Sequence, residues 1–215
     1  MTEMSPVGCV NSLKAGLEDL SPDDKLDLAT KAGRGLFGCE MRIVDDEGKG
    51  LPWDGKAYGA LQVRGPWVCS DYFKLEGSAE THTRDGWFDT GDVATIDPQG
   101  YMAITDRTKD VIKSGGEWIS SIELENTAMD HPAVAQAAVI GVAHPKWTER
   151  PLLVVVKAEG QDISKEDLLA YYDGKVASWW IPTDVAFVDE LPHTATGKVK
   201  KIELRKQFAD YRLPD

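Results

Sequence analysis

The sequence predicts an α+β protein, in which a small β-rich, distorted barrel-like subdomain precedes a mixed α+β domain. Between residues 33 and 105, short apolar runs alternate with turn signals such as Asp-Asp-Glu-Gly and Asp-Pro-Gln-Gly. After residue 109, helix starts that carry capping residues alternate with longer apolar runs typical of buried strands. The 215 residues are enough for two such parts. We expect the boundary near residues 107–109.

In the first part, the sequence indicates one helix and several short strands. The helix begins at Ser21-Pro22-Asp23-Asp24 and runs to Gly33. Serine is a good cap, proline suits the first turn, and the acidic residues favour the positive end of the helix. The strands that follow are expected at residues 41–44, 59–63, 93–96 and 101–104.

In the second part, helices and buried strands alternate. Ser120-Ser121-Ile122-Glu123 fits a capping box, and its helix is expected to run to about Met129. A second helix opens at Ser164 and runs through Tyr172, and a final helix is expected over residues 201–211. The buried strands are expected at residues 137–142, 152–156 and 184–188.

Composition and charge exclude several classes of protein. The net charge of −12 disfavours non-specific binding to nucleic acid or to an anionic membrane. Cys9, Cys39 and Cys69 form no C-x-x-C pair, so we expect neither a zinc site nor a redox motif. Residues 1–10 do not read as a signal peptide, and residues 133–143 are too short to span a bilayer. We therefore expect a cytoplasmic protein with no transmembrane segment, whose oligomeric state the sequence does not indicate.

The segment from Gly86 to Asp92, Gly-Trp-Phe-Asp-Thr-Gly-Asp, is the first candidate for chemistry. We expect a strand to end here in a tight turn that presents Asp92. An ionised carboxylate accepts hydrogen bonds only, so Asp92 suits the two hydroxyls of a ribose. The same letters are also good turn sequence, and taken alone the segment is better interpreted as a plain turn.

Two further segments combine cations with glycine. Residues 105–118 place several ionisable residues before Gly115 and Gly116, and adjacent glycines allow close backbone approach or positive φ. Residues 191–201 place Lys198 just after a glycine in a polar loop, where it could carry charge to a phosphoryl group. For residues 105–118, a charged linker with a hairpin turn is an equally good interpretation. Taken alone, the Lys198 loop is better interpreted as a solvated basic helix start. The loop lacks the spacing of a Walker motif.

The remaining polar and aromatic residues indicate no further site. The histidines show neither metal-ligand spacing nor a nucleophile partner, so we interpret them as structural or surface residues. Trp147, Trp179 and Trp180 fall between apolar strand and helix runs. We interpret these three as packing residues.

The three segments, together with Thr2-Glu3 ahead of them, occur in an order that resembles the motifs of the acyl-adenylate-forming superfamily. This superfamily includes acyl-CoA synthetases, firefly-type luciferases and nonribosomal peptide adenylation domains. The stretches at residues 113–121, 144–151 and 179–182 are similar to the fatty acyl-CoA ligase branch. The resemblance covers essentially the whole chain, and several motifs in order are far more specific than any one.

The resemblance implies nucleotide-binding and catalytic roles for five residues. Thr2 matches a threonine near the phosphates, and Glu3 matches a glutamate that helps to hold Mg²⁺. Asp92 matches the ribose-binding aspartate, and Arg107 matches an arginine that also contacts the nucleotide. Lys198 matches the lysine that assists adenylation.

The resemblance also implies a hinge and a CoA-binding loop. Lys109 matches the hinge position about which the small domain turns. Gly115 and Gly116 match the loop beside the pantetheine channel of CoA, and Trp118 follows that loop. Asp106 departs from the family pattern, because many relatives have glycine before the arginine. We expect this departure to be tolerated, although it leaves the hinge geometry open.

The implied activity is an AMP-forming ligation that consumes ATP, with Mg²⁺, and CoA. A carboxylic acid, expected to be a medium- or long-chain fatty acid, becomes an acyl-AMP and is then passed to CoA. Residues 1–106 correspond to the tail of the large N-terminal domain, 107–109 to the hinge and 110–215 to the mobile C-terminal AMP-binding-enzyme domain. The phosphate loop and the acyl pocket are expected upstream of Met1, so we expect the 215 residues alone to be inactive.

Two alternatives remain open. The chain could be a non-catalytic fragment that binds a nucleotide or CoA, or part of an adenylating enzyme that loads a carrier protein. The Gly-Gly-Glu-Trp stretch at residues 115–118 favours free CoA over a carrier protein.

Overall fold

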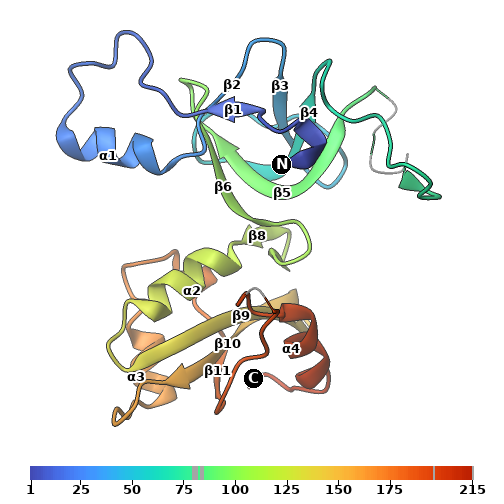
Figure 1. Ribbon diagram of the computed structural model, residues 1–215. Helices are drawn as coiled ribbons and strands as arrows, with labels where there is room; N and C mark the ends of the chain where they lie inside the picture. The colour runs from blue at the N-terminus through green and yellow to red at the C-terminus, as the bar shows by residue number, and fades with distance from the viewer. Residues whose placement is uncertain (79–81, 83–84, 196, 215) are drawn as a thin grey trace. The chain divides into compact units, whose positions relative to one another are not determined.

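The computed structural model describes residues 1–78, 82, 85–195 and 197–214 (Figure 1). The chain divides into two compact units, Met1–Thr108 and Lys109–Asp215. Sheets and helices occur in both units, so the predicted α+β class is confirmed. None of the helices within the described ranges combines the length and the apolar character that a membrane crossing requires.

The first unit is built on a four-stranded antiparallel sheet in the order β3-β4-β5-β6. The sheet is open and not the predicted barrel-like arrangement, because among the described strands β6 does not pair with β3. A short pair of strands, β1 with β2, and two helices flank the sheet. The elements are η1 (Thr2–Met4), β1 (Cys9–Val10), α1 (Pro22–Thr30), β2 (Arg34–Gly35), β3 (Glu40–Val44), β4 (Tyr58–Arg64), β5 (Phe88–Ile96) and β6 (Met102–Arg107).

One side of this sheet forms the apolar core of the first unit. Alternate residues of the strands point to the same face, so Ile43, Leu61 and Ile96 pack together with Met4 of η1. Helix α1 contributes no buried residue, and Leu26 on it is 67% exposed. The sheet with η1, and not α1, therefore positions the groups described below.

The second unit is organised around β10 (Thr148–Lys157), which pairs with three other strands. It pairs antiparallel with β9 (Val134–His144) over their length and parallel with β11 (Asp184–Phe187). At its start, β10 meets β7 (Ile112–Ser114), which forms a hairpin with β8 (Glu117–Ile119). The helices are α2 (Ser121–Met129), α3 (Lys165–Ala170), η3 (Ser178–Trp180) and α4 (Lys201–Gln207) (Figure 1).

Both faces of β10 are buried. Leu153 and Val155 face the core that contains Leu124 of α2 and Leu168 of α3. The alternate residues, such as Val154, face a second core that contains Leu204 of α4. A strand that is covered on both faces reads as a continuous apolar run, which explains why residues 152–156 were recognisable from the sequence.

The predicted helix starts are confirmed by their caps. The hydroxyls of Ser21, Ser120 and Ser164 accept hydrogen bonds from the backbone N–H three residues later, at 3.1, 3.2 and 3.0 Å. The final helix ends at Gln207, earlier than the predicted Tyr211. Phe208 and Tyr211 nevertheless pack on the core under α4, so the apolar pattern continues beyond the regular helix.

Replacing Ser120 by alanine is expected to destabilise the protein by about 1 kcal/mol, because the first turn of α2 loses its side-chain acceptor. Chemical denaturation of the 215-residue chain measures this loss. Ser178→Ala is the matched control, since η3 has no side-chain cap hydrogen bond. Equal losses in the two variants would show that the Ser120 cap does not stabilise α2.

Candidate functional site

Asp92 and Arg107 face each other across β5 and β6, as directly opposed residues of the antiparallel pair. The Arg107 Nη1 atom lies 2.9 Å from Asp92 Oδ1. The Asp92 side chain is 15% exposed, whereas that of Arg107 is 56% exposed. Burial raises the pKa of the Asp92 carboxyl, and the Arg107 charge lowers this pKa only in part. The pair therefore presents a sheltered carboxylate beside a solvated cation.

The backbone near Asp92 corrects one expectation. The strand does not end in a tight turn, because β5 continues from Phe88 to Ile96. Instead, its register against β4 shifts between Ala60 and Gln62, which forms a bulge. Gly91 adopts a φ of +73° within this bulge. Glycine tolerates that conformation, and a bulge re-aims the neighbouring side chain without ending the strand.

The N-terminal 3-10 helix η1 holds Thr2 and Glu3. Thr2 is exposed, whereas Glu3 Oε1 accepts a hydrogen bond of 3.0 Å from the Tyr72 hydroxyl. A backbone hydrogen bond and the Tyr72 hydroxyl lower the pKa of the Glu3 carboxyl. Thr90 and Asp92 border a hollow of about 350 Å³ together with Met4 of η1 and Met1, which precedes η1. The fold thus brings η1 and the Asp92 carboxylate to one region.

Glu3 fits Mg²⁺ only as a single ligand. The described residues contain no group of three or more His, Cys, Asp or Glu side chains able to hold a metal. Mg²⁺ keeps several waters and commonly binds one or two carboxylates together with substrate phosphates. The donor set therefore suits a metal that is bound along with a nucleotide.

The segment at the boundary of the two units contains Asp106 and Lys109. Asp106 is 1% exposed, and its Oδ1 atom accepts a hydrogen bond of 2.7 Å from the Arg107 backbone N–H. The N–H of Thr108 donates to Gly91 O at 3.0 Å. Lys109 is exposed and is the first residue of the second unit. Asp106 thus fixes the backbone that presents Arg107, while the hinge role of Lys109 remains a prediction.

Gly115 and Gly116 form the two-residue turn between β7 and β8, in which Ser114 pairs with Glu117. Their φ angles are +61° and +89°, which matches the type I′ turn that glycine pairs favour. A Cβ on Gly115 would lie 2.7 Å from the Trp147 ring, whereas one on Gly116 would meet nothing within 4 Å. Gly115 N also donates to Trp147 O at 2.9 Å. Gly115 is therefore required for close packing as well as for the turn.

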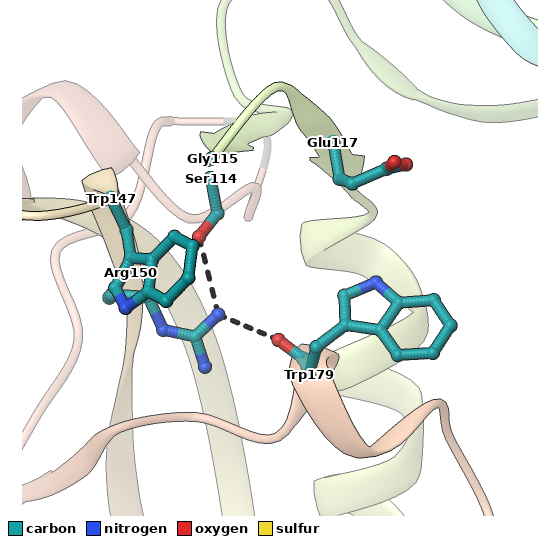
Figure 2. Close-up of a pocket in the computed structure, with 6 residues that line it drawn as sticks. All are labelled: Ser114, Gly115, Glu117, Trp147, Arg150 and Trp179. Carbon is teal, nitrogen blue, oxygen red and sulfur yellow. Dashed lines mark hydrogen bonds between the residues drawn. The ribbon is translucent and has the colours of Figure 1, made fainter.

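A pocket of about 370 Å³ opens beside this turn. Figure 2 shows the residues that line it: Ser114, Gly115, Glu117, Trp147, Arg150 and Trp179. The Trp147 and Trp179 residues are 41% and 57% exposed, so interpreting them as packing residues was wrong. The interpretation holds for Trp180, which packs against the core.

Trp118 does not line this pocket, although it follows the turn. It lies opposite Lys113 in the hairpin, with the Lys113 Nζ atom 4.9 Å from the Trp118 ring centroid. Trp147, Trp179 and Arg150 are the lining residues that sequence reasoning missed. The available signals were the family-like stretches at residues 144–151 and 179–182, which contain all three residues, and the position of a cation, Arg150, near the start of the apolar run of β10.

Lys198 is an exposed residue of a hairpin-like loop. Its backbone is fixed, because Thr194 N donates to Lys198 O at 2.7 Å and Lys198 N donates to Thr194 Oγ1 at 3.1 Å. Three residues later, Lys201 Nζ lies 2.6 Å from Glu125 Oε1 and 2.6 Å from Ser121 Oγ, both on α2. The loop is thus anchored to α2 while Lys198 remains solvent-accessible.

The candidate residues fall into separate groups. Asp92 and Arg107 are in direct contact within the first unit. Gly115, Gly116 and Trp118 share one hairpin of the second unit, and Lys198 stands on a different loop of that unit.

Comparisons with known proteins identify relatives over nearly the whole chain. Residues 123–198 match the AMP-binding enzyme C-terminal domain. The chain is 57% identical to a 3-methylmercaptopropionyl-CoA ligase of Ruegeria lacuscaerulensis, over 98% of the chain and 39% of that protein. It is 50% identical to a medium-chain-fatty-acid–CoA ligase of Ectopseudomonas oleovorans, over 99% of the chain and 39% of that protein. The chain therefore spans about two fifths of the length of these relatives.

A solved structure shares the fold. The crystal structure of ATP-bound MatB from Rhodopseudomonas palustris superposes with a TM-score of 0.73 at 36% identity. The similarity covers 84% of this chain and 36% of the MatB chain.

Alanine at Gly115 is expected to destabilise the protein more than alanine at Gly116. Each substitution costs about 1 kcal/mol for a left-handed backbone, and Gly115→Ala adds at least about 1 kcal/mol for overlap with the Trp147 indole. Denaturation of the two variants in parallel measures the difference, with Gly116→Ala as the matched control. Equal destabilisation would contradict the close contact between Gly115 and Trp147.

Replacing Asp92 by asparagine is expected to change the free energy of unfolding at pH 7 by no more than about 1 kcal/mol, because Arg107 is solvated. Since the folded pKa of Asp92 is raised, its ionised form costs stability, and this cost disappears as the pH falls through the raised pKa. The stability of Asp92→Asn relative to the native chain should therefore fall on acidification, as denaturation at several pH values would measure. A loss of several kcal/mol at pH 7 would instead identify a structural ion pair.

Proposed function

We propose that this chain forms part of an ATP-dependent ligase, because it belongs to the acyl-CoA ligase family of AMP-binding enzymes. The ligase activates a carboxylic acid as an acyl-AMP and transfers the acyl group to CoA. The observation that carries this proposal is the pocket beside the Gly115–Gly116 turn, in the same unit as the exposed Lys198. The second unit thereby offers a cation for adenylate formation and a pocket for the transfer to CoA.

In the first step, the substrate carboxylate attacks the α-phosphorus of ATP and pyrophosphate leaves. Two anions must meet, and negative charge builds on the phosphate oxygens. Lys198 supplies a positive charge beside these phosphate oxygens. Its exposed position on an anchored loop allows it to enter a site formed with other parts of the enzyme. Asp92 accepts hydrogen bonds from the ribose, while Arg107 and Thr2 contact the nucleotide. Glu3 would help to hold Mg²⁺, which would supply further positive charge for this step.

In the second step, the CoA thiol attacks the acyl carbonyl carbon and AMP leaves. This step needs a path for the pantetheine arm rather than the Lys198 charge. We place that path beside Gly115 and Gly116, where Trp147 and Trp179 offer apolar walls. A rigid turn of the second unit about Lys109 then exchanges the Lys198 loop for this pocket.

For the acid, we propose a medium- or long-chain fatty acid. The medium-chain-fatty-acid–CoA ligase at 50% identity supports this class. The 3-methylmercaptopropionyl-CoA ligase at 57% identity makes a short thioether acid the first comparison substrate. We further propose that the enzyme acts in the cytoplasm, where ATP and CoA are available.

The experiment separates the two half-reactions in the longest encoded form of the protein. Lys198→Ala is expected to lower carboxylate-dependent ATP–pyrophosphate exchange on the order of 100-fold, because one charge-stabilising donor is lost. Transfer from supplied acyl-AMP to CoA should change little. Lys206→Ala, an exposed lysine of α4, is the matched control.

Three outcomes would contradict parts of the proposal. Absence of any carboxylate-dependent exchange by the native protein would contradict the ligase activity. Full exchange activity in Lys198→Ala would contradict the role of Lys198. Transfer to a holo-carrier protein but not to free CoA would contradict the proposed acceptor.

A further inference from the structure

The Arg150 guanidinium lies at the pocket wall and joins two separate segments of the second unit (Figure 2). Its Nη1 atom donates to Ser114 Oγ at 3.3 Å and to Trp179 O at 2.6 Å. Its Nη2 atom donates to Ile181 O at 3.0 Å, and its Nε atom donates to Thr183 Oγ1 at 3.0 Å. One side chain thus connects the residue before the Gly115 turn to the segment from Trp179 to Thr183.

The partners of Arg150 are all uncharged. Two are backbone carbonyls and two are hydroxyls, and no carboxylate of the described residues forms an ion pair with the guanidinium. Burial accordingly lowers the pKa of Arg150. A partly buried cation without a counter-charge is costly, so an arginine here requires a reason that an apolar side chain would not satisfy. The planar fork of guanidinium donors, which reaches four acceptors at fixed angles, supplies that reason.

The opposite wall of the pocket is fixed by strained backbone. Glu149 N donates to Trp147 O at 2.8 Å across Thr148, whose φ is +69°. This three-residue turn is rare and strained, above all for a β-branched residue. Trp147 O also accepts from Gly115 N at 2.9 Å. The position of Trp147 is therefore fixed by hydrogen bonds to its backbone carbonyl. Trp179 is fixed in the same way, by the hydrogen bond from Arg150 to the Trp179 carbonyl.

We propose that Arg150 is a positioning residue for the acyl-transfer step: it braces the Trp179 wall against the Gly115 turn and so fixes the width of the acceptor pocket. The inference rests on the proposed function for its kinetic consequence, but the brace itself is a property of the second unit. Adenylate formation, which uses Lys198, does not depend on this brace.

The kinetic test uses Arg150→Gln and Arg150→Lys in the longest encoded form of the protein, with the exposed Arg212→Gln as control. Both Arg150 variants are expected to raise the KM for CoA at least about tenfold in transfer from supplied acyl-AMP, because a loosened wall misplaces the acceptor. ATP–pyrophosphate exchange should stay within about twofold of the native rate, since misplacement is confined to the acceptor. Lysine keeps the charge but cannot span the same acceptors, so it should not restore the KM.

A spectroscopic test of the 215-residue chain needs no activity. With 5-fluorotryptophan incorporated, the Trp179 resonance is assigned by its loss in Trp179→Phe. Arg150→Gln should shift or broaden this resonance, while Trp53 of the first unit keeps its native position. A native far-ultraviolet circular dichroism spectrum reports that the second unit is folded. If Arg150→Gln does not fold, Ser114→Ala and Thr183→Val each remove one acceptor and keep the charge, and the same shift is expected in both.

The two tests give distinguishable failures. An unmoved Trp179 resonance in the folded variants would overturn the brace, whatever the enzyme does. Equal losses of exchange and transfer would overturn the assignment to the acyl-transfer step, and full rescue by Arg150→Lys would show that charge alone acts. A native protein without exchange activity, combined with a shifted Trp179 resonance, would overturn the proposed function and its kinetic consequence but leave the brace in place.

Discussion

The pairing of β10 with three strands is the constraint on which the second unit depends. Its middle is buried on both faces, and its first residues meet the β7–β8 hairpin. There Thr148 pairs with Ser114, and Glu149 Oε2 accepts from Lys113 N at 3.2 Å in the space left by Gly141. Arg150 then reaches Ser114 and the backbone of η3. The position of the Gly115 turn therefore follows from the best-buried strand of the unit.

In the first unit, burial rather than distance distinguishes the candidate site from ordinary surface pairs. Arg64 and Glu40 approach to 2.7 Å, but both side chains are well exposed, at 42% and 58%. Such an exposed pair contributes little to stability, because water solvates and screens both charges. Asp92 approaches Arg107 at a similar distance but is 15% exposed, and its burial raises its pKa. A sheltered carboxylate kept at a cost in stability is the pattern expected where a ligand supplies the missing hydrogen bonds.

The sequence predicted the features that depend on local chemistry. Ser120 with Glu123, and Ser164 with Asp167, identify helix starts because a cap is complete within four residues. The bulge at Gly91 was read as a turn, since only the pairing of β5 with β4 shows that the strand continues. Trp147 and Trp179 were read as packing residues because an aromatic residue between apolar runs looks the same whether its partner is a core or a pocket. For Trp147 the answer depends on Gly115, and for Trp179 it depends on Arg150, and each of these partners is distant in sequence from its tryptophan.

The central claim is that the second unit serves the two half-reactions with different groups, Lys198 for adenylation and the Gly115 turn for transfer to CoA. Rapid-quench measurement of pyrophosphate formation from ATP and, separately, of acyl-CoA formation from supplied acyl-AMP, for Lys198→Ala and Gly115→Ala, tests it most directly. The account predicts a reciprocal pattern, in which Lys198→Ala slows only pyrophosphate release and Gly115→Ala slows only the thiol step. Variants that slow both steps to the same extent would contradict it.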